Sequence, residues 1–96
     1  MNPTDEKQCI RRILDGETEW FGTLVERYGR PLFVLAVQIV GQAEDAEEVV
    51  QDTFVNAYRH LSRFRGDSAF STWIYRIAYR TALSFVRKRK EEYVAI

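Results

Sequence analysis

The chain has 96 residues, of which 46% are hydrophobic, and its 14 Lys and Arg balance 14 Asp and Glu. This length allows one domain at most, and this composition excludes a disordered chain. One cysteine and one histidine exclude an internal disulfide and a four-ligand zinc site. The polar start is no signal peptide, and the longest apolar stretch, Pro31 to Val40, is far shorter than the roughly 20 residues of a membrane span. We therefore expect an intracellular protein without a membrane segment, metal ion or cofactor.

The neutral total hides two oppositely charged halves. Residues 1–56 carry 5 basic and 11 acidic side chains, a net charge of −6, whereas residues 57–96 carry 9 and 3, a net charge of +6. This asymmetry predicts two charged surfaces, one for a basic partner and one for a polyanion. We expect them on opposite flanks of the molecule.

The spacing of apolar residues predicts an all-α protein, because long helical periods alternate with few glycines and prolines and no hairpin turn. A first helix is expected over Asp5–Leu14, ending near Gly16. Thr18 is expected to cap a second helix. The apolar face of that helix would consist of Phe21, Leu24, Val25 and Tyr28.

Gly29 and Pro31 are predicted to interrupt this second helix, since proline lacks an amide donor. Proline is favoured in a first helical turn, so a new helix is expected to start there. Gly41 is a suitable C-terminal cap for it.

Two further helices complete the predicted bundle of about four to five helices. The first, over Glu44–Leu61, is acidic in its first turns, where the helix dipole favours negative charge. Its expected apolar face consists of Ala46, Val49, Val50, Thr53, Phe54, Ala57, Tyr58 and Leu61. After a loop, Ser68 or Ser71 is expected to cap the last helix, which runs to about Glu92. Its expected buried side consists of Ile74, Ile77, Ala78, Thr81 and Phe85.

Three motifs follow one another in this half of the chain: the acidic helix DAEEVVQDTF, the loop FRGDSAF and the helix opening STWIYRIA. With the preceding segment FGTLVERYGRPLFVLAVQIVG, they closely resemble bacterial sigma factors of the extracytoplasmic-function (ECF) group, from about Glu19 to Lys90. The resemblance implies a sigma region 2 domain over residues 1–96, with an N-terminal extension (1–17), a core bundle (18–92) and a tail (93–96). Nothing in the sequence resembles region 4.

A bacterial, cytoplasmic transcription initiation factor is the function that this resemblance implies. Such a domain binds core RNA polymerase and melts the promoter −10 element by capturing flipped bases of the non-template strand. The expected partners are polymerase, promoter DNA and an anti-sigma factor, with no small-molecule substrate.

The acidic helix provides the expected polymerase-binding residues. Glu48, Gln51 and Asp52 lie at positions i, i+3 and i+4 and therefore share one face. The resemblance implies that they meet the clamp helices of the β′ subunit, with Asp45 as a further candidate. The alternative is a solvated acidic face that aids solubility.

The loop of the second motif is implied to hold an unstacked base by stacking and by hydrogen bonds. Its candidate DNA-binding residues are Phe64, Arg65, Gly66, Asp67, Ser68 and Ala69. The alternative is a plain connector whose phenylalanines fill the core, and Phe70 is expected to be mostly structural.

The last helix interleaves rings with basic groups, a combination that suits stacking on bases and pairing with phosphates. Its candidates are Trp73, Tyr75, Arg76, Tyr79, Arg80, Arg87 and Lys88. Trp73 is a wedge against the duplex or a half-buried core residue. Arg80 stands where relatives often carry Asn, and it can contact guanine or hold a phosphate. The basic run Arg87–Lys90 binds phosphate or is a solvated helix end.

Two other classes of function fit the sequence less well. A helical protein-interaction module or regulator without DNA-melting activity shares the charged surfaces and differs only in lacking DNA binding. An enzyme is disfavoured, because the carboxylates lack the histidine, cysteine or glycine-rich loop of a catalytic or nucleotide site.

Overall fold

The computed structural model describes residues 3–95, which form four α-helices and two short 3-10 turns. The elements are α1 (Pro3–Leu14), η1 (Thr18–Trp20), α2 (Phe21–Val40), α3 (Ala43–His60), η2 (Leu61–Arg63) and α4 (Phe70–Ala95). Within this described range there is no strand, so the all-α prediction is confirmed. Residues 1, 2 and 96, the outer ends of the predicted extension and tail, lie outside it.

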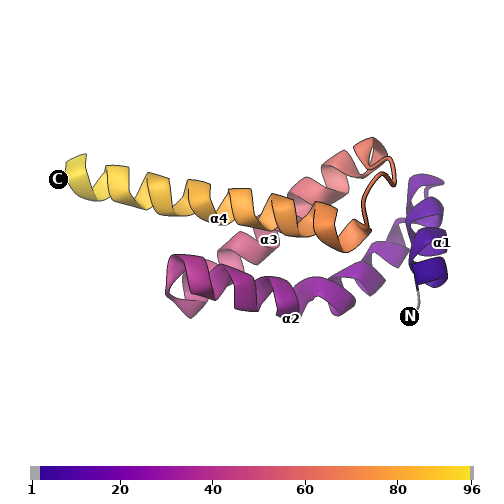
Figure 1. Ribbon diagram of the computed structural model, residues 1–96, viewed down its shortest axis with the longest axis horizontal. Helices are drawn as coiled ribbons and strands as arrows, with labels where there is room; N and C mark the ends of the chain where they lie inside the picture. Colours follow the sequence, from indigo (N-terminus) through magenta and orange to yellow (C-terminus); the bar gives the residue numbers. More distant parts are fainter. Residues whose placement is uncertain (1–2, 96) are drawn as a thin grey trace.

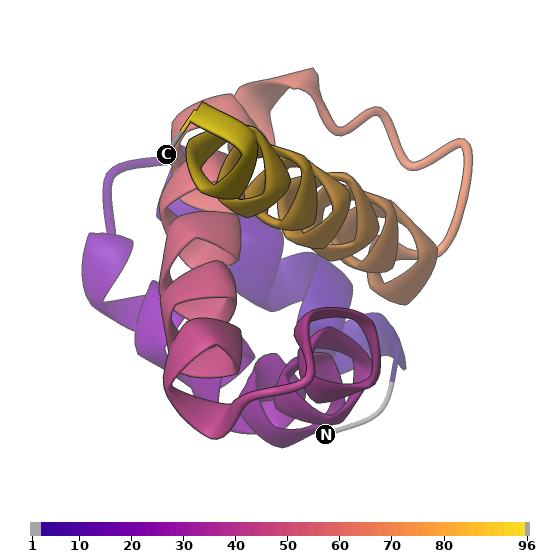
Figure 2. The same ribbon diagram turned by 90° about the vertical axis from the view of Figure 1, so that its left-hand side faces the viewer.

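Three long helices form the bundle, and α1 closes one end of it. Helices α2, α3 and α4 each contact the other two, and they surround a common centre in the end-on view (Figure 2). Figure 1 shows α1 standing across the end of the bundle, beside the loop that leads into α4. The molecule measures 48 × 24 × 21 Å because the C-terminal part of α4 continues beyond its neighbours (Figure 1).

The hydrophobic core is continuous from α1 to the middle of the bundle. Leu24, Leu32, Leu61 and Ile74 are almost fully buried there. The apolar stripe of α1 joins this cluster through Cys9, Ile10 and Ile13. The described part of the predicted N-terminal extension thus contributes side chains to the hydrophobic core.

The predicted break at Gly29 and Pro31 is wrong, because α2 is one helix of 20 residues that contains Pro31. The proline is exposed, while Tyr28 and Leu32 on either side of it are buried. Packing on both sides therefore offsets a proline penalty of about 3 kcal/mol. Figure 1 shows α2 bending part-way along, as expected of a helix with an internal proline.

The predicted helix ends are partly correct. Gly41 caps α2 in the left-handed conformation (φ 86°), and its amide donates to the carbonyl of Val37 at 2.8 Å, as predicted. Thr18 is not a cap, because it begins η1 instead.

The start of α4 also differs from the prediction. Ser71 is the second residue of α4, and the Ser68 hydroxyl donates to the carbonyl of Ala69 at 3.4 Å, so neither serine caps the helix. Helix α4 continues through Ala95, so the described part of the predicted tail is helical.

Two predicted core residues face solvent. Val25 and Tyr58 are 41% and 47% exposed, although both lie at helical spacing from buried neighbours. Each sits at the border of its helix's apolar stripe, where the register alone does not decide burial.

Candidate nucleic-acid interface

A groove of about 1070 Å³ runs between α3 and α4 and brings the two charged halves of the sequence together. Asp45, Glu48 and Asp52 line it from α3. The basic residues Arg80, Lys88 and Arg89 line it from α4. These three basic residues therefore lie beside the acidic face of α3 rather than on an opposite flank, because α4 packs against α3.

Asp45 is engaged within the chain. Its carboxylate accepts a hydrogen bond from Arg89 Nη1 at 2.8 Å, and Arg89 Nη2 donates to the carbonyl of Val40 at 3.1 Å. One guanidinium thus ties the N-terminal turn of α3 and the C-terminal end of α2 to α4. Asp45 and Arg89 are consequently less available to a partner than the other groove residues.

The remaining residues predicted to bind polymerase are open to solvent. Glu48, Gln51 and Asp52 are all exposed on α3, and the first and last of them also line the groove. The structure therefore leaves a free acidic surface on α3.

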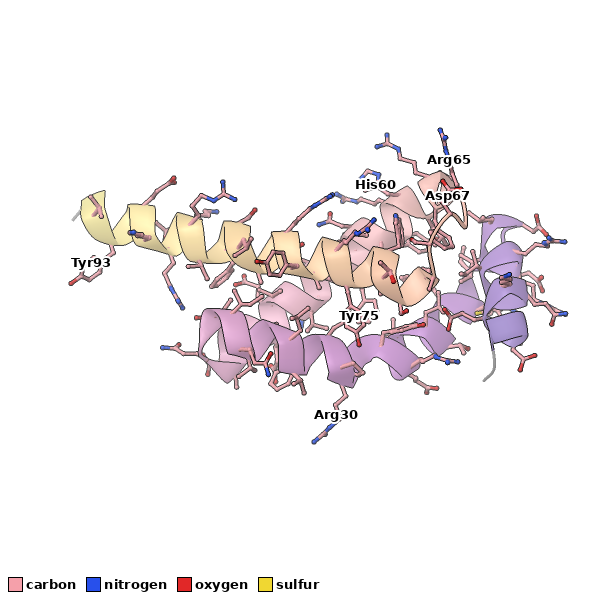
Figure 3. The ribbon with its side chains drawn as sticks, in the orientation of Figure 1. Arg30, His60, Arg65, Asp67, Tyr75 and Tyr93 are labelled. Atoms are coloured by element: carbon pink, nitrogen blue, oxygen red, sulfur yellow. The ribbon has the colours of Figure 1, made fainter. Side chains whose placement is uncertain are left out.

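The predicted DNA-binding side of α4 is also open. Arg76, Arg80, Arg87 and Lys88 are exposed, and within residues 3–95 no ion pair ties them to a carboxylate. A shallow hollow of about 450 Å³ gathers Tyr75 and Tyr79 with two of these arginines, Arg76 and Arg80. Figure 3 shows Tyr75 pointing from α4 towards α2. Rings and guanidinium groups thus lie side by side on one surface, as stacking on a single strand requires.

The loop before α4 presents its polar residues outward. Arg65 and Asp67 are exposed and project from the end of the molecule (Figure 3). Gly66 has φ 80°, a left-handed conformation that favours glycine at the tip of the loop.

The aromatic residues at the two ends of the loop pack against each other. Phe70 is buried, as expected, and the Phe64 ring lies 5.6 Å from it in an edge-to-face arrangement. The centroid of the Trp73 ring lies 5.3 Å from that of Phe64 and 5.6 Å from that of Phe70. This packing favours the core role for Trp73, which is half-buried, over the wedge role.

The comparisons with known proteins agree with this geometry. The Sigma-70 region 2 family matches residues 24–92. The chain belongs to this family. It is 44% identical to the RNA polymerase sigma-H factor of Pseudomonas aeruginosa over 77 residues, which are 80% of this chain and 40% of that protein. The ECF RNA polymerase sigma-E factor of Escherichia coli (strain K12) is 43% identical over 81 residues, 84% of this chain and 42% of that protein.

A more distant relative and a solved structure extend the match. The ECF sigma factor SigW of Bacillus subtilis is 31% identical over 87 residues, 91% of this chain and 46% of that protein. The NMR structure of an engineered region 2 of sigmaE in complex with GTAAAA matches with a TM-score of 0.85 and 32% identity. The match covers 96% of this chain and 93% of that one. The chain spans less than half of the curated relatives named here, and it is an ECF-type region 2 domain.

Sequence reasoning missed one pocket of this region 2 domain. A cavity of about 730 Å³ lies between the loop, α1 and α2. Arg65, Gly66, Ser68 and Ala69 line it from the loop, whereas Asp67 does not. The residues that line it from the two helices are Glu6, Lys7, Ile10, Arg11, Leu14, Arg27 and Tyr28, and Asp15 lines it directly after the end of α1.

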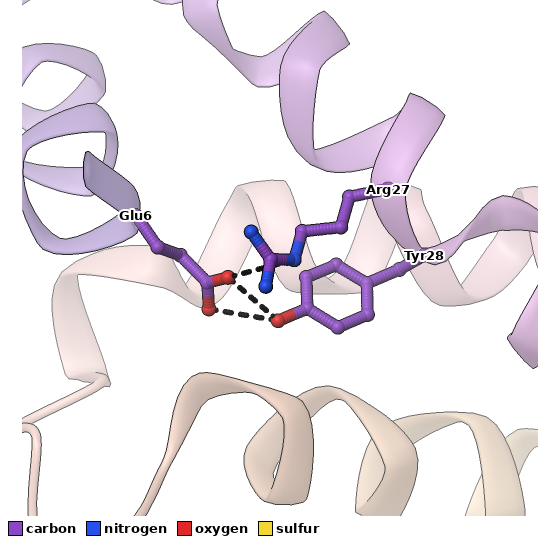
Figure 4. Close-up of polar contacts among 3 residues, drawn as sticks. All are labelled: Glu6, Arg27 and Tyr28. Atoms are coloured by element: carbon purple, nitrogen blue, oxygen red, sulfur yellow. Dashed lines mark hydrogen bonds and ion pairs between the residues drawn. The ribbon is translucent and has the colours of Figure 1, made fainter. Parts of the chain in front are cut away.

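The side of this pocket formed by α1 and α2 holds a polar network in which Glu6 and Tyr28 are buried and Arg27 is exposed (Figure 4). The Tyr28 hydroxyl lies 2.8 Å from both carboxylate oxygens of Glu6, and Arg27 Nε lies 3.3 Å from Glu6 Oε2. Burial and the hydrogen bond with Glu6 raise the pKa of Tyr28 to about 12, so the phenol stays protonated and donates. One signal for this site was present in the sequence: Glu6 occupies the first position of the stripe that continues through Cys9, Ile10 and Ile13.

Residues 3–95 contain no cluster of three or more histidine, cysteine or acidic side chains that could hold a metal ion. None of the helices in this range is both long and apolar enough to cross a bilayer.

Proposed function

We propose that this region 2 domain binds core RNA polymerase and opens the promoter −10 element by capturing bases of the non-template strand. The observation that carries the proposal is the match, at a TM-score of 0.85, to a sigmaE region 2 solved with GTAAAA. The shallow hollow that tyrosine rings and arginine side chains of α4 line together supports it independently.

In this proposal helices α3 and α4 have different partners. Glu48, Gln51 and Asp52 meet the clamp helices of the β′ subunit through the exposed acidic face of α3. The single strand runs along α4, where Tyr75 and Tyr79 stack on bases while Arg76, Arg80 and Arg87 contact phosphates. An anti-sigma factor would cover the same surfaces, and the site of action is the bacterial cytoplasm, where polymerase works.

The polymerase supplies the chemistry, and this domain supplies binding energy for strand separation. Each base that stacks on a ring returns about 1–3 kcal/mol, against a few kcal/mol for unstacking and unpairing it. A few captured bases therefore tip the melting equilibrium once polymerase holds the rest of the duplex.

A titration with −10 non-template oligonucleotides, with and without core polymerase, tests the proposal. We expect tighter binding to the single strand than to the same sequence as a duplex. The logarithm of the affinity should fall with the logarithm of the salt concentration, with a slope of about −0.7 per phosphate contacted.

Two matched double variants separate the partners. Arg76→Glu with Arg80→Glu should abolish binding to the single strand while polymerase binding persists. Glu48→Lys with Asp52→Lys should do the reverse. Intact polymerase binding with no promoter opening by the unmodified protein would instead favour the protein-interaction module.

A further inference from the structure

The loop that lines the 730 Å³ pocket is joined to its flanking elements by short-range hydrogen bonds. The Phe64 amide donates to the carbonyl of Leu61 at 3.0 Å, the Ser68 hydroxyl donates to the carbonyl of Ala69, and the Trp73 amide of α4 donates to the same carbonyl at 3.1 Å. Packing between the aromatic residues at its two ends, Phe64 and Phe70, adds to these bonds. Of these, Phe70 is the buried one.

Phe70 in turn rests on Tyr28. The two ring centroids are 5.5 Å apart, so the position of the Tyr28 ring on α2 determines where the end of the loop can pack. Tyr28 is only 7% exposed. Its hydroxyl is held by Glu6 from α1, at 2.8 Å from both carboxylate oxygens (Figure 4).

A continuous series of contacts thus joins α1 to the loop: from Glu6 to Tyr28, from Tyr28 to Phe70, and from Phe70 to Phe64. Glu6 is 8% exposed and also lines the pocket itself. Burying a carboxylate on an otherwise apolar stripe costs free energy unless the carboxylate is paired. Here one of its partners, Tyr28, also contacts Phe70 at the end of the loop.

We propose that Glu6 is a positioning residue for base capture: through Tyr28 and Phe70 it holds the loop in the conformation that accepts a flipped base. Helix α1 is then one wall of the DNA site, although the Sigma-70 region 2 match begins only at residue 24. This inference rests on the proposed function, since it assigns the pocket to a base of the bound strand.

The test compares the oligonucleotide GTAAAA with versions in which one base at a time is replaced by an abasic sugar. For the unmodified protein, the abasic position that costs most affinity identifies the captured base. Tyr28→Phe removes the hydroxyl but keeps the ring, and Glu6→Ala removes the acceptor. Each should weaken binding of intact GTAAAA about three- to tenfold, the factor of one ordinary hydrogen bond, and should leave binding of that abasic version unchanged.

Two control variants on α1 separate positioning from a general loss of structure. Glu6→Gln keeps an oxygen that accepts from Tyr28 and should restore most of the affinity. Gln8→Ala changes an exposed residue of α1 that does not line the pocket, so it should behave as the unmodified protein. Thermal unfolding confirms that each variant is folded at the temperature of the titration.

The outcomes are distinct. Equal weakening of intact and abasic oligonucleotides, or no weakening at all, overturns the positioning role while the proposed function stands. Failure of the unmodified protein to bind any of the oligonucleotides, with polymerase present or absent, overturns both.

Discussion

Two polar contacts between helices lie at opposite ends of this bundle: the Glu6–Tyr28 tie between α1 and α2, and the Asp45–Arg89 tie between α3 and α4. They differ mainly in burial. At the α1 end, Glu6 and Tyr28 are 8% and 7% exposed. In the α3–α4 groove, the side chains of Asp45 and Arg89 are 24% and 45% exposed, although their bond is equally short at 2.8 Å.

This difference shows that distance alone says little about the strength of a contact. A buried donor that loses its acceptor cannot turn to water, so breaking the Glu6–Tyr28 tie costs about 1–3 kcal/mol. An exposed ion pair exchanges its partner for water and contributes about 0–1 kcal/mol. We therefore expect the Glu6–Tyr28 pair to contribute to the stability of the fold. The Asp45–Arg89 pair, which lies where partners are proposed to bind, should break at little cost in free energy.

The largest effect is expected from removing the buried acceptor. Glu6→Ala should lower the free energy of unfolding by about 2 kcal/mol, because it leaves the Tyr28 hydroxyl buried without a partner. Urea unfolding monitored by circular dichroism measures this change. Glu6→Gln should lose much less, and a loss of under about 0.5 kcal/mol for Glu6→Ala would contradict this expectation.

High pH should weaken the same tie. Burial and the hydrogen bond with Glu6 raise the pKa of Tyr28 from 10.0 to about 12. The folded state therefore holds the phenolic proton more tightly than the unfolded state, so this stabilisation is complete below pH 10 and is lost as the pH rises towards 12. The difference in unfolding free energy between the unmodified protein and Tyr28→Phe should shrink over this window, and a constant difference would argue against the raised pKa.

A smaller effect is expected at the groove. A double-mutant cycle with Asp45→Ala and Arg89→Ala should give a coupling energy below about 1 kcal/mol, falling further in 1 M salt. The measurement is urea unfolding at low and high salt. A salt-independent coupling above about 2 kcal/mol would show that this pair behaves as a buried one.

The smallest effect is expected for Arg12 and Glu17, whose side chains are 53% and 49% exposed and whose charged atoms are 3.8 Å apart. Glu17→Gln should change the free energy of unfolding by less than about 0.5 kcal/mol. Arg12 keeps its position over the Trp20 ring in this variant, so the thermal midpoint should also be nearly unchanged.

Sequence reasoning succeeded where a local rule decides the structure. Gly41 is predicted as a cap because glycine adopts the left-handed conformation of a common helix ending without a Cβ clash, and its φ is 86°. It failed at Pro31, where the local penalty is real but is offset by the burial of Tyr28 and Leu32, and this burial depends on residues far along the chain.

The candidate site divides in the same way. The exposed arginines and Tyr79 of α4 could be found from their spacing, because an exposed helix face is a property of one segment. Glu6 was missed, since its role depends on a tyrosine 22 residues away in sequence and on a loop that starts much later. The intrachain pairing of Asp45 with Arg89, over a separation of 44 residues, escaped prediction for the same reason.

The amino-acid sequence by itself determined the helical class, the family and the identity of the charged and aromatic residues, because periodicity and motifs are encoded within single segments. Only the tertiary structure decided that α1 is a wall of the loop pocket and that the acidic and basic residues share one groove. Both results depend on which helix faces pack together. That choice is set by the total apolar surface buried in the core, which depends on all the helices at once and not on the pattern within one segment.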